Sequence, residues 1–256
     1  MLAAAKTCGY LRSRTHIRLP SKNQVMLMTL PGTVARAPQG IIGFDSDTKI
    51  NSAQARQYFA RGFRFCVRYV SRDDASRKNN EKRGTPDLSI DEARTILDAG
   101  MAIMAVQHVA NPGWHPTAQL GHTYGENASS YAADAGLPAG VNLWLDLEGI
   151  AKGTSHQDII AYCNAWFDAA TTSGYVPGVY VGFDVFLSSD ELFFDLKMKH
   201  YWRADGNIPD VSHRGYQLFQ HIQNPNTPNE FDRDVTKNDA FGGAVIWLVE
   251  NSALVA

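Results

Sequence analysis

Residues 141–149 read Val-Asn-Leu-Trp-Leu-Asp-Leu-Glu-Gly, an apolar run that ends in two acids. Strand side chains alternate between two faces, so the three leucines share one face and Trp144, Asp146 and Glu148 share the other. The leucine face predicts packing beneath helices, and the other face predicts a polar site. Acids at i and i+2 lie roughly 6.5–7 Å apart at Cα. In a partly dry place their repulsion raises the proton affinity of one, which is how a site obtains an acid and a base from two carboxyls. An ordinary strand end with solvated acids is the alternative.

The residues on both sides of this strand repeat a strand–helix unit. Glycines suited to ending helices occur at 62, 100, 136 and 174, about 38, 36 and 38 residues apart. Each is expected to close a helix, and the four helices are expected at 52–62, 89–100, 126–136 and 154–174. The strands expected before, between and after these helices are 41–45, 63–70, 102–109, 141–149 and 177–182. Strands that alternate with helices at this spacing predict βαβ units on a parallel sheet.

The rhythm changes after Gly182. One amphipathic helix is expected within 183–198, followed by strands at 199–204, 216–222 and 231–236. The gaps between these strands are too short for a full crossover helix. We therefore predict a (β/α)8-type TIM barrel of the α/β class, irregular because helices are reduced or missing between the last three strands. A doubly wound open sheet is the alternative, although it usually has a glycine-rich first turn that this chain lacks. Residues 244–249 are expected to add a C-terminal strand.

Composition and length fit one barrel domain at residues 40–256. The chain has 256 residues, 44% of them hydrophobic, and a net charge of −2, so it offers no electrostatic case for nucleic acid or an anionic membrane. No apolar run has the roughly 18 residues of a transmembrane helix. Residues 1–39 form a basic, irregular extension that we interpret as disordered, or alternatively as a weak signal peptide. The three cysteines are too few and too scattered for a disulfide framework or a cysteine metal site.

The expected strand ends carry polar and aromatic side chains, and barrel active sites are built at the carboxyl ends of strands. In chain order they are Asp45, Arg68, Tyr69, Gln107, His108, Asp146, Glu148, Tyr180, Trp202, Arg203, Gln220, His221, Asp232 and Asp234. Carboxylates with aromatic rings between them suit a carbohydrate, because sugar C–H faces stack on rings while acids bind hydroxyls and transfer protons.

Each of these residues also has a structural interpretation. Asp45 could cap a helix, Arg68 could pair with an acid, and His108 could be a hydrogen-bonded core residue. Trp202 could be plain barrel packing, and the acids near 232 could belong to a turn. A Mg²⁺ or Ca²⁺ site built from carboxylates is a further alternative, but no clustered histidines, strand lysine or glycine-rich phosphate loop is present. We expect no metal and no cofactor.

Eight short motifs, in this order and spacing, resemble a known family. They are Gly43-Phe44-Asp45, Phe65-Cys66-Val67-Arg68-Tyr69, the Leu-Ser-x-Asp-Glu-Ala helix before Ala99-Gly100, Leu145-Asp146-Leu147-Glu148, Val179-Tyr180-Val181-Gly182, Tyr201-Trp202-Arg203-Ala204, Leu218-Phe219-Gln220-His221 and Phe231-Asp232-Arg233-Asp234-Val235. The stretch from Gly40 to Lys237 resembles the glycoside-hydrolase-like domain known as domain of unknown function 1906, which is similar to the family-25 lysozymes that cleave peptidoglycan. The resemblance implies a barrel whose last three strands lack full helices.

The resemblance also implies roles for individual residues. Glu148 would be the proton donor, and Asp146 would orient the N-acetyl group of the substrate or stabilise positive charge. Asp45 and Asp232 would line the −1 sugar subsite, with Asp232 favoured over its neighbour two residues on. The residues expected to contact the glycan are Tyr69, His108, Tyr180, Trp202, Gln220 and Asp234.

Two functions follow from this set of residues. The first is hydrolysis of a β-linked N-acetylhexosamine glycan such as peptidoglycan, with Glu148 as the acid. The second is a non-catalytic glycan-binding or cell-envelope module that uses the same cleft. In both cases we expect a monomer whose partner is a carbohydrate polymer, secreted or located in the cell envelope. The charged loop 71–87 is longer than a lysozyme needs and is expected to cover the cleft.

Overall fold

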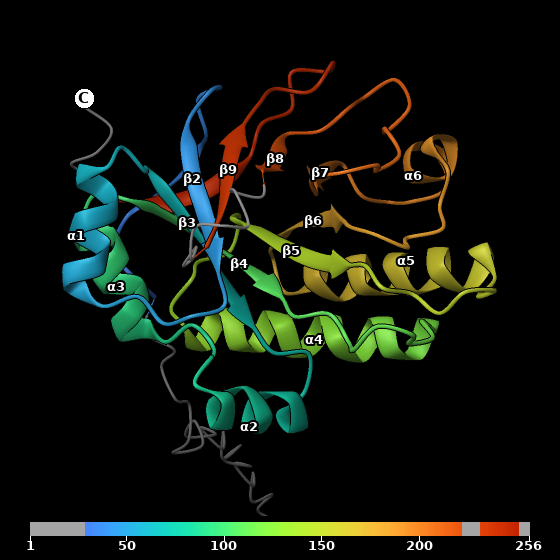
Figure 1. Cartoon of the computed structure of the whole chain (residues 1–256), viewed down its shortest axis with the longest axis horizontal. Helices are drawn as coiled ribbons and strands as arrows, with labels where there is room; N and C mark the ends of the chain where they lie inside the picture. Colours follow the sequence, from blue (N-terminus) through green and yellow to red (C-terminus); the bar gives the residue numbers. More distant parts are fainter. Residues whose placement is uncertain (1–28, 222–230, 251–256) are drawn as a thin grey trace, which may run out of the picture.

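The computed structural model describes residues 29–221 and 231–250, and eight of its strands close into a barrel (Figure 1). The barrel strands are β2 (Ile42–Ser46), β3 (Phe65–Val70), β4 (Ala102–Gln107), β5 (Asn142–Leu147), β6 (Val176–Val181), β7 (His200–Arg203), β8 (Leu218–His221) and β9 (Asp232–Thr236). Neighbours from β2 to β8 pair in parallel, whereas β9 runs antiparallel to both β8 and β2. The β9–β2 pairing closes the ring, which confirms the predicted barrel and excludes the open sheet.

Helices cover the first half of the barrel and become sparse after β6, as predicted. They are α1 (Ser52–Ala60), α2 (Asp74–Arg83), α3 (Ile90–Asp98), α4 (Ala118–Asp134), α5 (His156–Thr172) and α6 (Ser189–Phe194). The four glycines expected to end helices all have φ between 80° and 98°, a conformation that glycine adopts without steric cost. The repeat in the sequence therefore corresponds to the repeat in the fold.

Three helices differ from the prediction. The helix expected from residue 126 begins eight residues earlier, after the capping residue Thr117. It contains Gly121 and Gly125 because the backbone of α5 passes so close that a Cβ would lie 2.1 Å and 2.8 Å from its carbonyl oxygens. In the segment 183–198, where one amphipathic helix was expected, the structure has only the six-residue helix α6. The loop 71–87 contains α2, which the sequence did not predict because this run has no apolar stripe.

The core has two layers that follow the predicted alternation along β5. Leu143, Leu145 and Leu147 pack outward beneath the helices, where α4 and α5 lie side by side against the barrel (Figure 1). Trp144 points into the barrel and meets Trp202 there, with ring centroids 5.8 Å apart. The barrel interior is thus filled by side chains, and a site can exist only above this filling.

A pair of antiparallel strands closes the end of the barrel where the parallel strands begin. β1 (Thr33–Arg36) pairs with β10 (Ile246–Val249), and β10 also pairs with β4 at Ile103. Trp247 on β10 packs against Phe65 inside the barrel, with ring centroids 5.5 Å apart. The expected C-terminal strand is therefore present, whereas residues 29–39 are not irregular as predicted, because they supply β1.

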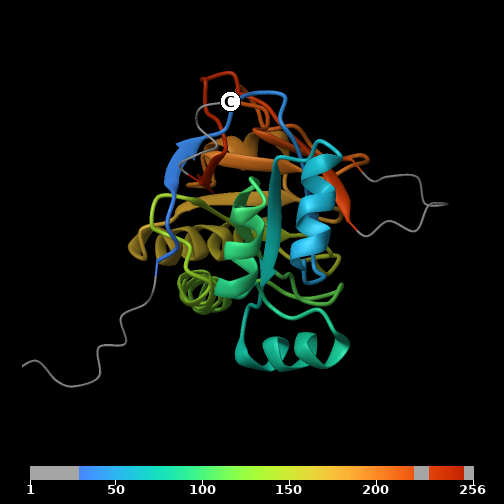
Figure 2. The same ribbon diagram turned by 90° about the vertical axis from the view of Figure 1, so that its left-hand side faces the viewer.

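The signal-peptide interpretation concerns residues that lie mostly outside the described part of the chain. Among residues 29–221 and 231–250, the structure contains no helix with the length and apolar character needed to span a membrane. Figure 2 shows the barrel from the side of α1 and α3, with α2 apart from the other helices at one end.

Candidate functional site

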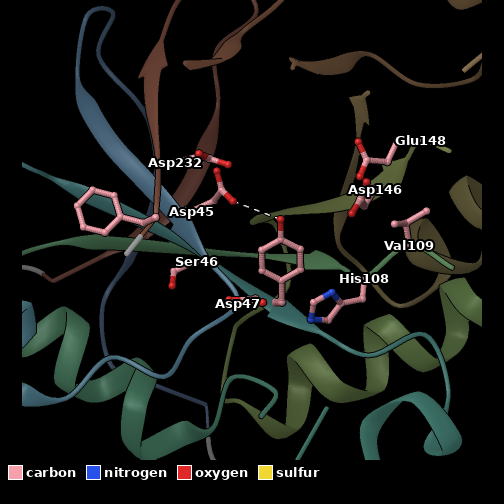
Figure 3. A pocket seen from close by; sticks show the side chains of 10 residues that line it. Asp45, Ser46, Asp47, His108, Val109, Asp146, Glu148 and Asp232 are labelled. Atoms are coloured by element: carbon pink, nitrogen blue, oxygen red, sulfur yellow. Dashed lines mark hydrogen bonds between the residues drawn. The ribbon is translucent and has the colours of Figure 1, made fainter. Parts of the chain in front are cut away.

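A cavity of about 410 Å³ opens where the parallel strands end (Figure 3). Its walls combine five carboxyl groups with aromatic and polar side chains. The lining residues are Asp45, Ser46, Asp47, Tyr69, His108, Val109, Asp146, Glu148, Phe231 and Asp232. The volume lies within the range of small-molecule sites. The structure therefore brings together the four residues predicted as catalytic, together with two of the six predicted to contact the glycan.

The direction of β9 explains how Asp232 reaches this rim. A parallel strand delivers its last residues to the carboxyl end of the barrel, whereas the antiparallel β9 delivers its first. Asp232 is the first residue of β9 and stands opposite Asp45 in the β2–β9 pairing. Phe231, just before it, packs against Phe44 with ring centroids 4.5 Å apart. Burial and the nearby charge of Asp205 raise the pKa of Asp232.

The two acids at the end of β5 differ in depth. Asp146 is only 5% exposed, and Glu148 beyond it is half-buried. Burial raises the pKa of Glu148 to about 7. Burial, together with the charges of Glu148 and Asp45, raises the pKa of Asp146 well above its ordinary value, and the backbone amide of Val109 offsets part of this. Oδ1 of Asp146 is buried without a hydrogen-bond partner among the described residues, which further disfavours its charged form.

Two neighbours that the sequence analysis missed hold Glu148 in place. The indole N–H of Trp114 donates to the backbone oxygen of Glu148 over 2.9 Å. Gly182 leaves room for the side chain, because a Cβ on this residue would lie 2.4 Å from Oε2 and 2.5 Å from Cβ of Glu148. The motif ending in Gly182 contained the signal, since a glycine directly after a strand often marks a close approach. No pattern in the sequence pointed to Trp114.

Asp45 is held by a hydrogen-bonded chain that runs across the barrel. The Tyr69 hydroxyl donates to its Oδ1 over 3.2 Å, and the Gln220 amide donates to its Oδ2 over 2.9 Å. The Tyr180 hydroxyl donates in turn to Gln220 Oε1 over 2.8 Å. Burial nevertheless raises the pKa of Asp45 to about 7, and the charge of Asp232 adds to the rise while these hydrogen bonds oppose it. Asp45 is thus part of the site and does not cap a helix, since the side chain at the start of α1 is Asn51.

Asp234 and Trp202 lie in the layer beneath the cavity. Asp234 is fully buried, and its Oδ1 accepts a hydrogen bond from the Trp202 indole over 2.9 Å. Its Oδ2 faces Asp45 and has no donor among the described residues, so the two carboxyls can form a hydrogen bond only when one is protonated. Burial and the charge of Asp45 accordingly raise the pKa of Asp234 well above its ordinary value.

Part of the predicted contact set lies in this layer and not on the cavity wall. Trp202 packs edge-on against Trp144 and Tyr180 inside the barrel and is almost completely buried, which matches its structural interpretation. Gln220 and Tyr180 act through Asp45 and do not line the cavity. Of the expected sugar contacts, Tyr69 and His108 line the cavity, and their rings pack 4.3 Å apart at the centroids.

The basic and imidazole groups near the cavity are an ion-paired arginine and a histidine with a lowered pKa. Arg68 forms a fully buried ion pair with Glu92 over 2.7 Å, so it pairs with an acid as the alternative interpretation held, and that acid is not Glu148. Burial lowers the pKa of His108 to about 4, with the charge of Arg68 contributing. Across the ranges 29–221 and 231–250, no three side chains of the metal-binding types form a set of metal ligands.

Comparisons with known proteins agree with this geometry. The structure of the Tat-secreted protein Rv2525c from Mycobacterium tuberculosis matches with a TM-score of 0.58 and 18% identity over 80% of this chain and 98% of that one. A family 25 glycosyl hydrolase from Bacillus anthracis matches with a TM-score of 0.50 and 13% identity over 78% and 90%. A muramidase from Acremonium alcalophilum matches with a TM-score of 0.50 and 16% identity over 78% and 95%.

At these identities the three structures establish the fold, a barrel of the type found in family-25 muramidases. No curated protein sequence matches the chain. The family model described as "Rv2525c-like, glycoside hydrolase-like domain" matches residues 56–240, which is more than half of the chain and includes every strand of the barrel except β2. The protein is therefore a member of the Rv2525c-like, glycoside hydrolase-like domain family, structurally related to the family-25 muramidases.

Proposed function

We propose that this protein hydrolyses a β-linked N-acetylhexosamine glycan of the peptidoglycan type, with Glu148 as the general acid. The observation that carries the proposal is the half-buried Glu148 at the rim of an acidic cavity, free of any ion pair with Arg68 and with its pKa raised to about 7. An acid with this pKa is protonated often enough near neutral pH to donate to a leaving oxygen, and it can take a proton back afterwards.

The other acids support the same chemistry from fixed positions. Glu148 protonates the glycosidic oxygen as the bond to the anomeric carbon breaks, and the transition state has oxocarbenium character. Asp146, two residues before Glu148, orients the acetamido group of the substrate. The oxygen of that group attacks the anomeric carbon as an internal nucleophile. Asp45 and Asp232 lie side by side across the cavity from this pair (Figure 3) and hold hydroxyls of the sugar.

Names of the structural relatives support the substrate class and the location. Two of the similar structures are a family 25 glycosyl hydrolase and a muramidase, and Rv2525c is a Tat-secreted protein. We extend these properties to this chain as part of the proposal, with a glycan of the cell envelope as its partner and an extracytoplasmic location.

The test is release of reducing ends from purified peptidoglycan. The full chain should release them, and Glu148→Gln should lower the rate by about 10²–10⁴-fold, the usual contribution of a positioned general acid. Glu126→Gln, which neutralises an exposed glutamate on α4, is the matched control and should leave the rate unchanged.

A glycan-binding module without catalysis would give a different result. It would bind the glycan saturably, the binding would survive Glu148→Gln, and neither form would release reducing ends. Equal release by the wild type and Glu148→Gln would refute the role assigned to Glu148.

A further inference from the structure

A second cavity, of about 240 Å³, adjoins the acidic one and shares Asp47, His108 and Val109 with it. Its remaining walls are polar and come largely from α2 and the residues next to it. Those that matter here are Arg72, Asn79, Asn80, Arg83 and Asn111. Because the two cavities share walls, a ligand in the acidic cavity can extend a substituent into the second one.

One face of α2 forms the wall of this second cavity. Ser76, Asn79, Asn80 and Arg83 follow the i, i+3, i+4, i+7 spacing that places residues on one side of a helix. In most helices such a stripe is apolar and faces the core. Here it is polar, and Ser76 is the only residue of the helix that is buried. The helix therefore does not owe its position to a buried apolar face.

Polar contacts with α4 fix α2 beside the cavity instead. The Tyr131 hydroxyl donates to Asp74 Oδ1 over 2.6 Å, and the guanidinium of Arg77 lies 4.8 Å from the centre of the Tyr131 ring. The Asn127 amide donates to the backbone oxygen of Arg72 over 2.8 Å. Figures 1 and 2 show α2 standing clear of the barrel, in the segment that follows β3.

Charge is divided between the two cavities. The acidic cavity has five carboxyl groups and no lysine or arginine among its lining residues. The second cavity has two guanidinium groups, those of Arg72 and Arg83, against one carboxylate, that of the shared Asp47. Nη1 of Arg72 also donates to the backbone oxygen of Val109 over 2.8 Å. Within the described part of the chain, no carboxylate lies within ion-pair distance of Arg83, and the carboxylate near Arg72, that of Asp73, is 3.7 Å away. An anionic ligand would be repelled by the first cavity and attracted by the second.

We propose that the second cavity binds a carboxylate carried by a substituent of the glycan whose sugar occupies the acidic cavity. This inference rests on the proposed function, because it assigns the substrate a charged side group. Guanidinium groups bind carboxylates through paired N–H donors, and amides such as Asn79 and Asn111 add donors of their own. The protein would thereby select acid-bearing glycans such as those built with muramic acid over neutral chitin-like chains.

The test uses two ligands that differ in one charge per muramic residue. A tetrasaccharide of alternating N-acetylglucosamine and N-acetylmuramic acid is compared with its methyl ester, with binding measured calorimetrically to the Glu148→Gln protein so that turnover does not interfere. The free acid should bind more tightly, and added salt should weaken its binding but not that of the ester. Arg83→Gln should weaken binding of the acid roughly 2–5-fold, as expected for an exposed charge pair, and leave the ester unaffected.

Lys82→Gln is the matched control, because it removes one positive charge from α2 outside the cavity-lining face. Equal affinity for acid and ester, or equal losses with Arg83→Gln and Lys82→Gln, would overturn the proposal.

Inorganic phosphate at millimolar concentration is the competing ligand. If phosphate displaces the acid from the protein, and this displacement is lost in the Arg83→Gln variant, the cavity is a phosphate site and the carboxylate assignment is overturned. Preference for the acid without release of reducing ends by the wild type would refute the hydrolase and keep this site, and no binding of either glycan would end both proposals.

Discussion

The acids on β5 and β9 have the same spacing and opposite order. At the end of β5 the first acid, Asp146, is the deep one, and the second, Glu148, which directly follows the strand, is at the rim. On β9 the first acid, Asp232, is at the rim and the second, Asp234, is completely buried. The order is reversed because β5 is a parallel strand and β9 is antiparallel. The direction of the strand, rather than position in the motif, therefore decides the depth of each acid: Glu148 and Asp232 lie at the rim of the cavity, Asp146 lines its deeper part, and Asp234 lies beneath it.

The largest effect is expected from Gly182, whose missing side chain leaves room for Glu148, the rim acid at the end of β5. Gly182→Ala places a methyl group where the Glu148 side chain now lies, and a displacement of about 1 Å at a reacting group can cost about 10²-fold in rate. The measurement is kcat/KM for glycan hydrolysis, with thermal unfolding to confirm that the barrel is intact. In a Glu148→Gln background the same substitution should have almost no further effect, and a full additional loss would show that Gly182 acts elsewhere.

The pH dependence of the rate should identify the rim acid of β5 as a proton donor. Because burial raises the pKa of Glu148 to about 7, the donor loses its proton as pH rises through that value. Above about pH 7, kcat/KM should fall roughly tenfold per pH unit. A rate that stays constant from pH 6 to 9 would exclude Glu148 as the acid.

The deep acid of β9 should affect stability more than activity. The pKa of Asp45 is raised from 3.8 to about 7 and that of Asp234 is also raised, so the folded protein retains protons that the unfolded chain releases. The free energy of unfolding should therefore decrease as pH rises from about 4 to about 7. Asp234→Asn supplies an amide donor to Asp45 and should reduce this decrease by about 1–2 kcal/mol.

This prediction is measured by chemical unfolding at pH 5 and pH 8. Asp98→Asn, which neutralises an exposed carboxyl at the end of α3, is the control and should keep the pH dependence of the wild type. An Asp234→Asn protein with the same pH dependence as wild type would show that the two buried carboxyls do not share a proton.

The smallest effect is expected from the rim acid of β9. Asp232→Asn keeps the shape of the side chain, removes its charge and replaces one acceptor oxygen by an amide donor. Since Asp232 is proposed to hold a sugar hydroxyl, KM should rise a few-fold while kcat changes little, corresponding to about 1 kcal/mol for one hydrogen bond. A loss of kcat as large as that of Glu148→Gln would mean that the two rim acids act together in the chemical step.

Most of the barrel was predictable because its signals are local. Helix-ending glycines and the alternation along β5 depend on nearest neighbours in the sequence, and the structure agrees with both. The direction of β9 was not predictable, because alternation is the same in parallel and antiparallel strands. The choice of Asp232 over Asp234 for the sugar subsite came from the resemblance; the structure places Asp232 on the cavity wall, and its role there stays a prediction.

Sequence patterns also failed where a residue owes its place to a distant partner. α2 has no apolar stripe, since contacts with Tyr131 and Asn127 of α4 hold it. The early start of α4 was concealed by Gly121 and Gly125, which weaken helix signals yet are required by the close approach of α5. Trp202 was expected at the sugar from the resemblance, but it lies inside the barrel and its indole donates to Asp234.

The closure formed by β1 and β10 determines how short the chain can be made. The family match ends at residue 240, and a protein truncated there would lose Trp247 and the backbone N–H of Ile246, which donates to Asn142 at the start of β5 over 2.6 Å. Water would then reach Phe65 and the other apolar side chains within the barrel from the end where the parallel strands begin. The shortest independently folding fragment therefore includes residues from both ends of the described chain, although every acid of the site lies between them.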